Sequence, residues 1–126
     1  MSERGAVITI GGREYELLLT TKATKEIAGR YGGLDHLGDK LMKSENFEMA
    51  LSEIVWLITL LANQSILVHN ITDKEHPKDL LTEDEVEILT SPFELAGYKA
   101  AITAAMYAGT KRNVESEEDS KNAQVG

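Results

Sequence analysis

The chain contains no cysteine and only two prolines, and basic residues are outnumbered by acidic ones. Without cysteine there are no disulfides, no thiolate ligands for zinc and no cysteine nucleophile, as is typical of a cytosolic protein. Thirteen Lys and Arg stand against 21 Asp and Glu, which gives a net charge of −8. Because an acidic surface repels phosphate backbones, nucleic acid is not an expected partner.

A long uninterrupted apolar run is missing as well. The most apolar stretch, Ile54 to Val68, spans about 15 residues and is interrupted by Thr59, Asn63, Gln64 and Ser65. A membrane-spanning helix needs roughly 20 mostly apolar residues. The N-terminus also lacks the apolar core of a signal peptide. We therefore expect a buried core helix, no membrane partner and a location in the cytoplasm.

The chain does have enough apolar sequence for one hydrophobic core. Its 126 residues are 42% hydrophobic, which fits a single globular domain, expected over residues 6–112. After that point only Val114, Ala123 and Val125 are apolar. This composition predicts a flexible, disordered acidic tail over residues 113–126.

The N-terminal segment predicts a β-hairpin. Gly11-Gly12 supplies the two positive φ angles of a type I′ turn, with an alternating run on each side. A two-residue loop places Ile8 opposite Tyr15 and Ala6 opposite Leu17 on one apolar face. The other face is polar, so the hairpin should pack its apolar face on helices. The expected fold class is α+β, mainly α-helical.

Capping residues and apolar spacing predict about five helices after the hairpin. The first begins at the Thr20-Thr21 cap and stops at Gly32-Gly33. A short amphipathic helix is expected over residues 34–43. The longest helix should run from about Glu45 to His69 and lie centrally, because its apolar residues extend nearly all the way round.

After a polar connection over residues 70–80, two capping boxes predict the last two helices. Thr82-Glu83-Asp84-Glu85 and Ser91-Pro92-Phe93-Glu94 each place a hydroxyl residue three positions before a glutamate. Proline suits the first helical position of the second. Gly109 is the expected stop of the last helix.

The last helix offers the predicted protein-binding surface. Its core-facing side is expected to carry Leu95, Tyr98, Ile102 and Met106, while Ala100, Ala104 and Tyr107 form a strip that another helix could approach closely. Aromatic residues dominate binding hot spots. The aromatics Trp56, Phe93, Tyr98 and Tyr107 are nevertheless more typical of a core than of a contact surface.

No motif for chemistry is present. The three histidines, His36, His69 and His76, form no metal pair at helical spacing, and the acidic residues after Thr82 suit the dipole of a helix start. Gly29 to Gly33 follows a helix and lacks the lysine of a phosphate loop. The sequence therefore predicts no catalytic residue, no cofactor and no metal, and a protein that is not an enzyme.

Taken together, the hairpin segment Ile8–Leu17, the Thr20-Thr21-Lys22-Ala23 helix start, the two capping boxes and the acidic tail resemble the tail assembly chaperones of long-tailed bacteriophages and prophages of Gram-positive hosts. The resemblance implies a non-enzymatic protein that keeps the tape-measure protein soluble until the tail tube assembles. It also implies a protein of the host cytoplasm that is absent from the finished virion. Such chaperones are often made in two lengths by ribosomal frameshifting.

The resemblance leaves several partners and one other function class open. The tail-tube protein and a second copy of the chain are further candidate partners. The alternative function is a structural virion component, such as a minor tail or head–tail joining protein, which would be found in purified particles. A DNA-binding regulator is disfavoured because no helix is basic enough to enter a groove.

Overall fold

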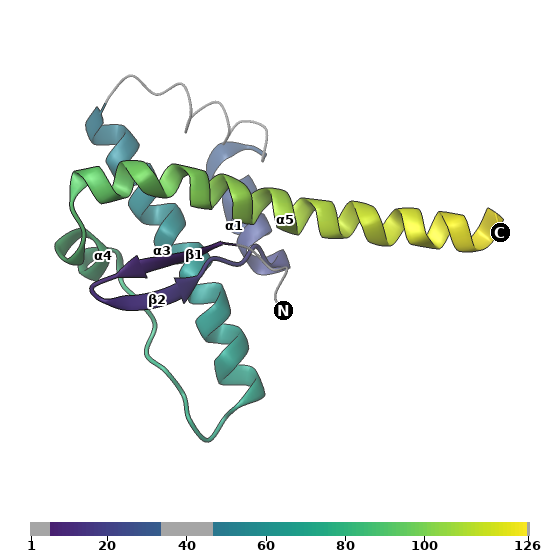
Figure 1. Cartoon of the computed structure of the whole chain (residues 1–126), viewed down its shortest axis with the longest axis horizontal. Helices are drawn as coiled ribbons and strands as arrows, with labels where there is room; N and C mark the ends of the chain where they lie inside the picture. Colours follow the sequence, from purple (N-terminus) through teal and green to yellow (C-terminus); the bar gives the residue numbers. More distant parts are fainter. Residues whose placement is uncertain (1–5, 34–46, 126) are drawn as a thin grey trace.

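The computed structural model describes residues 6–33 and 47–125 and confirms a mainly helical α+β fold with an N-terminal hairpin (Figure 1). The helix predicted over residues 34–43 lies outside the described residues. Within them, the elements in chain order are β1 Val7–Ile10, β2 Arg13–Glu16, α1 Thr21–Tyr31, α3 Phe47–Thr72, α4 Glu83–Leu89 and α5 Pro92–Val125.

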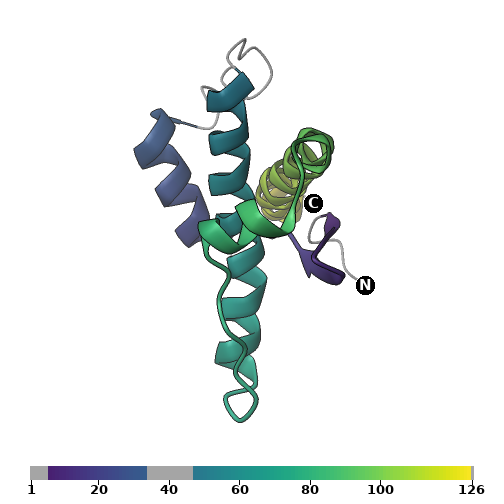
Figure 2. The ribbon, with the colours of Figure 1, turned by 90° about the vertical axis from the view of Figure 1, so that its left-hand side faces the viewer.

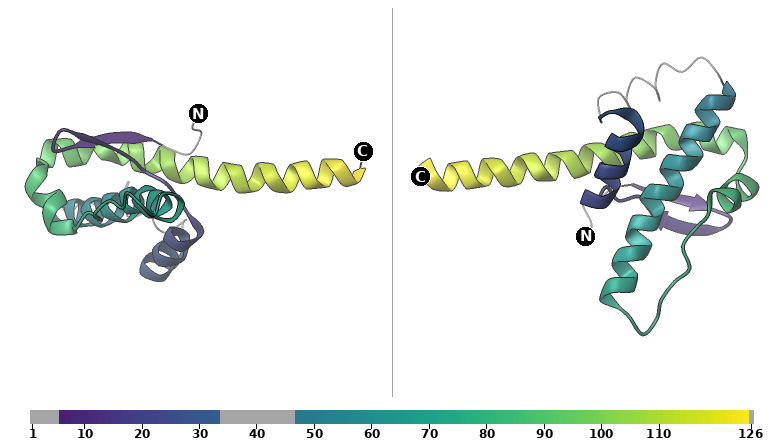
Figure 3. Two further views of the ribbon diagram at one scale, coloured as in Figure 1. Left: turned by 90° about the horizontal axis from the view of Figure 1, so that it is seen from below. Right: turned by 180° about the vertical axis from the view of Figure 1, so that it is seen from behind.

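Helix α3 is the centre of the fold. It contacts α1, α4, α5 and β2, while α5 also contacts β1. Seen along the axis of α5, α1 lies on one side of α3, and α5 and the hairpin lie on the other (Figure 2). The view from below shows the same order of layers, from the hairpin and α5 through α3 to α1 (Figure 3). The core therefore forms on both sides of α3, as its nearly continuous apolar surface predicts.

The hairpin has the predicted turn and register. Gly11 and Gly12 adopt φ of 57° and 83°, and Ile8 pairs with Tyr15. Ile8 is 6% exposed, whereas Val7 on the other face is 59% exposed. The alternation arises because successive side chains of a strand point to opposite faces. One hairpin face thus closes the core beside α3 and α5.

Helix α1 begins and ends as its sequence predicts. The Thr20 side chain accepts a hydrogen bond from the Ala23 N–H at 3.0 Å, which satisfies one of the unpaired donors of the first turn. Gly32 takes the left-handed conformation (φ 85°), and its N–H donates to the Ala28 carbonyl. Its buried residues are Ala23, Ile27 and Tyr31.

Helix α3 is longer than predicted at its C-terminal end. It continues to Thr72, so the connection expected to start at residue 70 begins three residues later. Its stretch Leu51–Thr72 is 22 residues long and apolar enough to cross a bilayer, so the length argument from the sequence was wrong. Half of the most apolar window is, however, buried against the rest of the protein, as in the core helix of a globular fold.

Two asparagines of α3 hold the chain that leads from α3 to α4. Asn63 donates to the Leu81 carbonyl at 2.9 Å and accepts from the Leu81 N–H at 2.8 Å. One stretch further along, Asn70 makes the same pair of hydrogen bonds with Lys78, at 3.0 and 2.8 Å. The segment 78–81 is thus tied along α3 through its backbone, and Leu81 is only 9% exposed.

Both predicted capping boxes are present. The Thr82 hydroxyl accepts from the Glu85 N–H, and the Glu85 carboxylate accepts from the Thr82 N–H. Ser91 and Glu94 make the same reciprocal pair at the start of α5. Helix α4 ends at Leu89, and Thr90 is already extended. Helical backbone is also disfavoured at Ser91 because this residue precedes Pro92. The two boxes therefore fix the corner between α4 and α5.

The predicted end of the last helix is wrong. Helix α5 passes through Gly109 and continues to Val125, beyond the body of the protein (Figure 1). A glycine inside a helix costs only about 1 kcal/mol, and between Gly109 and Gly126 the chain contains no proline or glycine. Propagation of a helix that has already formed is therefore easy. The backbone of residues 113–125 is helical, where the composition predicted an irregular tail.

Gly109 is instead a packing residue. A Cβ added to it would lie 2.8 Å from the Leu19 Cβ, whereas a Cβ on Gly97 would meet nothing within 4 Å. We expect Gly109→Ala to lower the free energy of unfolding by about 1–3 kcal/mol, because overpacking outweighs the gain in helix propensity. Gly97→Ala, the matched control, should raise it by up to about 1 kcal/mol. Chemical denaturation measures both; a stabilised Gly109→Ala variant would contradict the close packing of Leu19 on α5.

Candidate functional site

The described residues contain no group of three or more His, Asp or Glu that could hold a metal ion. His76 contacts Asp73 at 3.0 Å, and His69 donates to the His76 carbonyl at 2.7 Å, both at the exposed end of α3. These contacts close the turn after α3.

One cluster of ionisable groups fastens α1 to α3. Arg30 lies 4.4 Å from the centre of the Trp56 ring and pairs with Glu53, which also accepts a hydrogen bond from the Tyr31 hydroxyl. Burial raises the pKa of Tyr31 well above its usual range, and the bond to Glu53 raises it further. A hydroxyl that holds its proton this firmly is no acid or base near neutral pH. The cluster is structural.

Helix α5 has an apolar surface on the side away from the core. Helical geometry places Leu95, Ile102 and Ala105 on one side, and these are 5%, 0% and 0% exposed. On the opposite side, every residue of a stripe about 120° wide is exposed. We call this stripe the outer face of α5: Phe93, Ala96, Gly97, Ala100, Thr103, Ala104 and Tyr107.

The outer face of α5 is almost free of charge. Although charged residues make up 27% of the chain, Glu94 and Lys99 are the only ones between Pro92 and Thr110. A helix on the surface of a soluble protein normally turns a charged face to water. The small side chains leave a shallow groove of about 750 Å³ along the helix, and Lys99 is the one charged residue among those that line it. The described part of α5 up to Gly109 therefore lacks the charged outward face of a typical surface helix.

The structure brings the predicted binding residues together. Ala100, Ala104 and Tyr107 all lie on the outer face and line its groove. Tyr107 is 66% exposed, as its place on the predicted binding strip requires. Phe93 is 88% exposed, so the interpretation of this aromatic residue as part of the core is wrong. Phe93 is two residues before the inward-facing Leu95, a rotation of about 200°, which turns it outward.

The polar contact beside this face is also structural. The Tyr98 hydroxyl donates to the Thr9 carbonyl at 2.6 Å and ties α5 to β1. Burial raises the pKa of Tyr98, and the nearby Glu94 carboxylate adds to the increase. Tyr98 therefore keeps the proton that this hydrogen bond needs, and the orientation of α5 on the hairpin is fixed.

Comparison with protein-family models, curated proteins and solved structures gives no match for this chain. The resemblance to tail assembly chaperones therefore stays a prediction.

Proposed function

We propose that the protein is a phage tail assembly chaperone that binds an amphipathic helix of the tape-measure protein on the outer face of α5. The observation that carries this proposal is the exposed, nearly uncharged stripe from Phe93 to Tyr107. The two residues are about 21 Å apart along the helix, a length that suits several turns of a client helix. Small residues between them let a second helix approach closely, and the two aromatics provide contact area at each end.

The rest of the molecule supports a holding function. Capping boxes, the Tyr98 bond and the packed Gly109 fix α5 on the body, so the binding surface is preorganised and little entropy is lost on binding. The net charge of −8 keeps the protein soluble despite its apolar stripe. Binding that shields an apolar client helix needs no catalytic group.

We expect the double variant Ala100→Glu/Ala104→Glu to lose most of its ability to keep a co-expressed tape-measure protein soluble. Each unpaired carboxylate at the centre of an apolar interface costs roughly 2–5 kcal/mol, which is more than tenfold in affinity. Both positions are exposed in the free protein, so its melting temperature should change little. The measurement is the soluble fraction of the client, with circular dichroism of the variant.

Ala28→Glu provides the matched control, because Ala28 is exposed on α1, away from the outer face. It should solubilise the client as the wild type does. Unchanged solubilisation by the double variant would remove the outer face as the client site. Light scattering then tests self-association: a wild-type dimer that the double variant converts to monomer would assign the face to a second copy. Recovery of the protein in purified particles would favour a structural virion component.

A further inference from the structure

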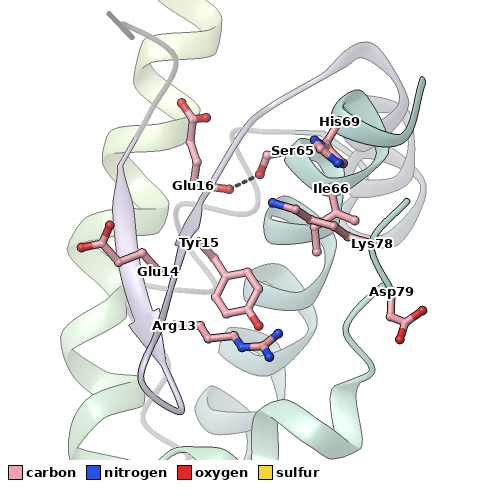
Figure 4. Close-up of a pocket in the computed structure, with 9 residues that line it drawn as sticks. All are labelled: Arg13, Glu14, Tyr15, Glu16, Ser65, Ile66, His69, Lys78 and Asp79. Atoms are coloured by element: carbon pink, nitrogen blue, oxygen red, sulfur yellow. Dashed lines mark hydrogen bonds between the residues drawn. The ribbon is translucent and has the colours of Figure 1, made fainter. Parts of the chain in front are cut away.

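A second surface feature is a cleft along the open edge of β2. Its volume is about 400 Å³, and its walls come from β2, the C-terminal half of α3 and the segment that follows α3 (Figure 4). All four residues of β2 line it, and no residue of β1 or α5 does. In the part of the chain that the structure describes, the sheet has two strands, so β2 has no neighbouring strand on this edge. We call this feature the β2–α3 cleft.

The register of the hairpin decides which backbone groups of β2 point towards the open edge. The Leu17 N–H donates to the Ala6 carbonyl, and hydrogen-bonded pairs recur at every second residue of an antiparallel ladder. Glu14 and Glu16 lie between such pairs, so their backbone groups point away from β1. The Glu16 carbonyl follows this direction, because it accepts a hydrogen bond from the Ser65 hydroxyl of α3 at 2.5 Å.

Glu14 leaves one donor and one acceptor of the backbone unused at this edge. Neither its N–H nor its C=O forms a hydrogen bond within residues 6–33 and 47–125, and the residue is exposed. Extended peptides add to a sheet at such an unpaired strand edge. An antiparallel strand uses both groups of Glu14 at once, because it exchanges both bonds with one opposite residue.

The walls beside this edge are already fixed. The Ser65 bond holds β2 on α3, and two hydrogen bonds from Asn70 hold the backbone of Lys78 on the far side of the cleft. A peptide therefore meets a groove that already has its shape, which lowers the entropic cost of binding. Because Ser65 occupies the Glu16 carbonyl, there is room only for a short added strand.

We propose that the β2–α3 cleft binds a short extended segment of a partner protein as a third, antiparallel strand, with a lysine or arginine opposite Glu14. The side chain of the opposite residue lies on the same face of the sheet as the Glu14 carboxylate. Figure 4 shows this carboxylate pointing away from Arg13, and it has no cationic partner within the described ranges. The net charge of −8 also attracts a basic segment.

The residues on either side of the basic one should be apolar. They point to the inner face of the sheet, where Tyr15 and Ile66 line the cleft. Arg13 and Lys78 also extend into the cleft on this side (Figure 4), so they repel a second basic side chain there. The segment therefore alternates, with its positive charge outward and its apolar residues inward.

A second copy of the chain fits this edge less well. Antiparallel pairing of β2 with itself through these backbone groups sets Glu14 opposite Glu14 or Glu16. Like charges that face each other destabilise a sheet. The partner is therefore a different, basic segment, and this inference does not depend on the chaperone function.

The test is a titration of the full-length, ¹⁵N-labelled protein with the peptide acetyl-Thr-Val-Lys-Val-Thr amide. We expect the amide signals of Glu14, Tyr15 and Ser65 to shift, and hydrogen exchange at the Glu14 N–H to slow. The same peptide with an N-methylated lysine cannot donate to the Glu14 carbonyl, so it should bind at least about fivefold more weakly. Replacing the lysine with glutamate should also weaken binding about fivefold.

Two variants of the protein separate the backbone from the charge. Glu14→Ala removes the carboxylate and keeps the N–H. Glu14→Pro removes both and leaves the β1–β2 ladder intact, because the Glu14 N–H points away from β1. We expect Glu14→Pro to bind at least about fivefold more weakly than Glu14→Ala. Glu87→Ala, which removes an exposed carboxylate of α4 outside the cleft, should bind like the wild type.

Four results would overturn the proposal. Absence of binding by the lysine peptide would remove the cleft as a site for such a strand. Equal binding of the N-methylated peptide to the wild type would show that the backbone edge is not used, whatever the stability of Glu14→Pro. Equal binding of the glutamate peptide would show that no basic residue is recognised. A Glu14 signal that moves with protein concentration alone would assign the edge to a second copy. None of these outcomes bears on the outer face of α5.

Discussion

Replacing Leu17 with aspartate should largely unfold the protein. Leu17 is fully buried in the core, and the next residue donates from its N–H to the Leu61 carbonyl of α3. The substitution would place an unpaired carboxylate in this apolar environment at a cost of roughly 3–6 kcal/mol. Because domains of this size are stable by only about 5–15 kcal/mol, we expect a loss of most of the cooperative melting transition.

Val7→Lys gives the control on the opposite face of the same hairpin. Val7 is 59% exposed and directly opposite Glu16, so a lysine there meets water and an opposite charge. Its stability should stay within about 1 kcal/mol of the wild type. If Leu17→Asp melted like Val7→Lys, the hairpin would not pack on α3 as described.

We expect Asn63→Asp to cost about 2–3 kcal/mol although the two side chains have nearly the same shape. The amide of Asn63 both donates to and accepts from the backbone of Leu81. A carboxylate at position 63 can still accept from the Leu81 N–H, but it cannot donate to the Leu81 carbonyl. A carboxylate oxygen and the carbonyl oxygen then face each other in a partly buried position. The segment between α3 and α4 should then detach, with a lower midpoint of chemical denaturation.

Asn70→Asp is the matched control, because Asn70 makes the same pair of bonds with Lys78 in an exposed position. Water can replace the lost donor there, so we expect a cost below about 1 kcal/mol. A protonated aspartic acid at position 63 can again donate to the Leu81 carbonyl, so folding should raise its pKa. The loss of stability should therefore shrink as the pH falls towards 4. If both substitutions lowered the free energy of unfolding equally and independently of pH, the paired hydrogen bonds between Asn63 and Leu81 would not stabilise the fold as described.

Local chemistry explains why much of the fold could be predicted. The turn at Gly11-Gly12 sets the register of the hairpin, because a one-residue shift would move every apolar side chain to the wrong face. The boxes at Thr82 and Ser91 act between residues three apart, so their partners are visible in the sequence. Such features need no knowledge of the tertiary structure.

The contacts that the sequence does not reveal connect residues far apart in the chain. Asn63 reaches a partner 18 residues away, and Gly109 makes room for Leu19. The sequence does hint at the contact of Asn63. Asparagine is a poor helix former, and Asn63 and Asn70, seven residues apart, lie on one face of α3. Gly109 carried no such sign, since glycine suits a helix end equally well.

The candidate site was partly predictable for the same reason. Ala100, Ala104 and Tyr107 follow from helical spacing once Leu95 and Ile102 are placed in the core. Phe93 was missed because a large aromatic residue beside a capping box resembles a core anchor. Its 88% exposure adds one end to the proposed binding surface.

Thiol protection tests most directly whether a client helix covers the outer face of α5. Because the chain has no cysteine, Ala100→Cys carries a single thiol, and Ala28→Cys places one on the exposed side of α1. We predict that the bound tape-measure protein strongly slows alkylation at position 100 and leaves the rate at position 28 unchanged. Equal rates with and without bound client at position 100 would contradict binding of the client on the outer face of α5.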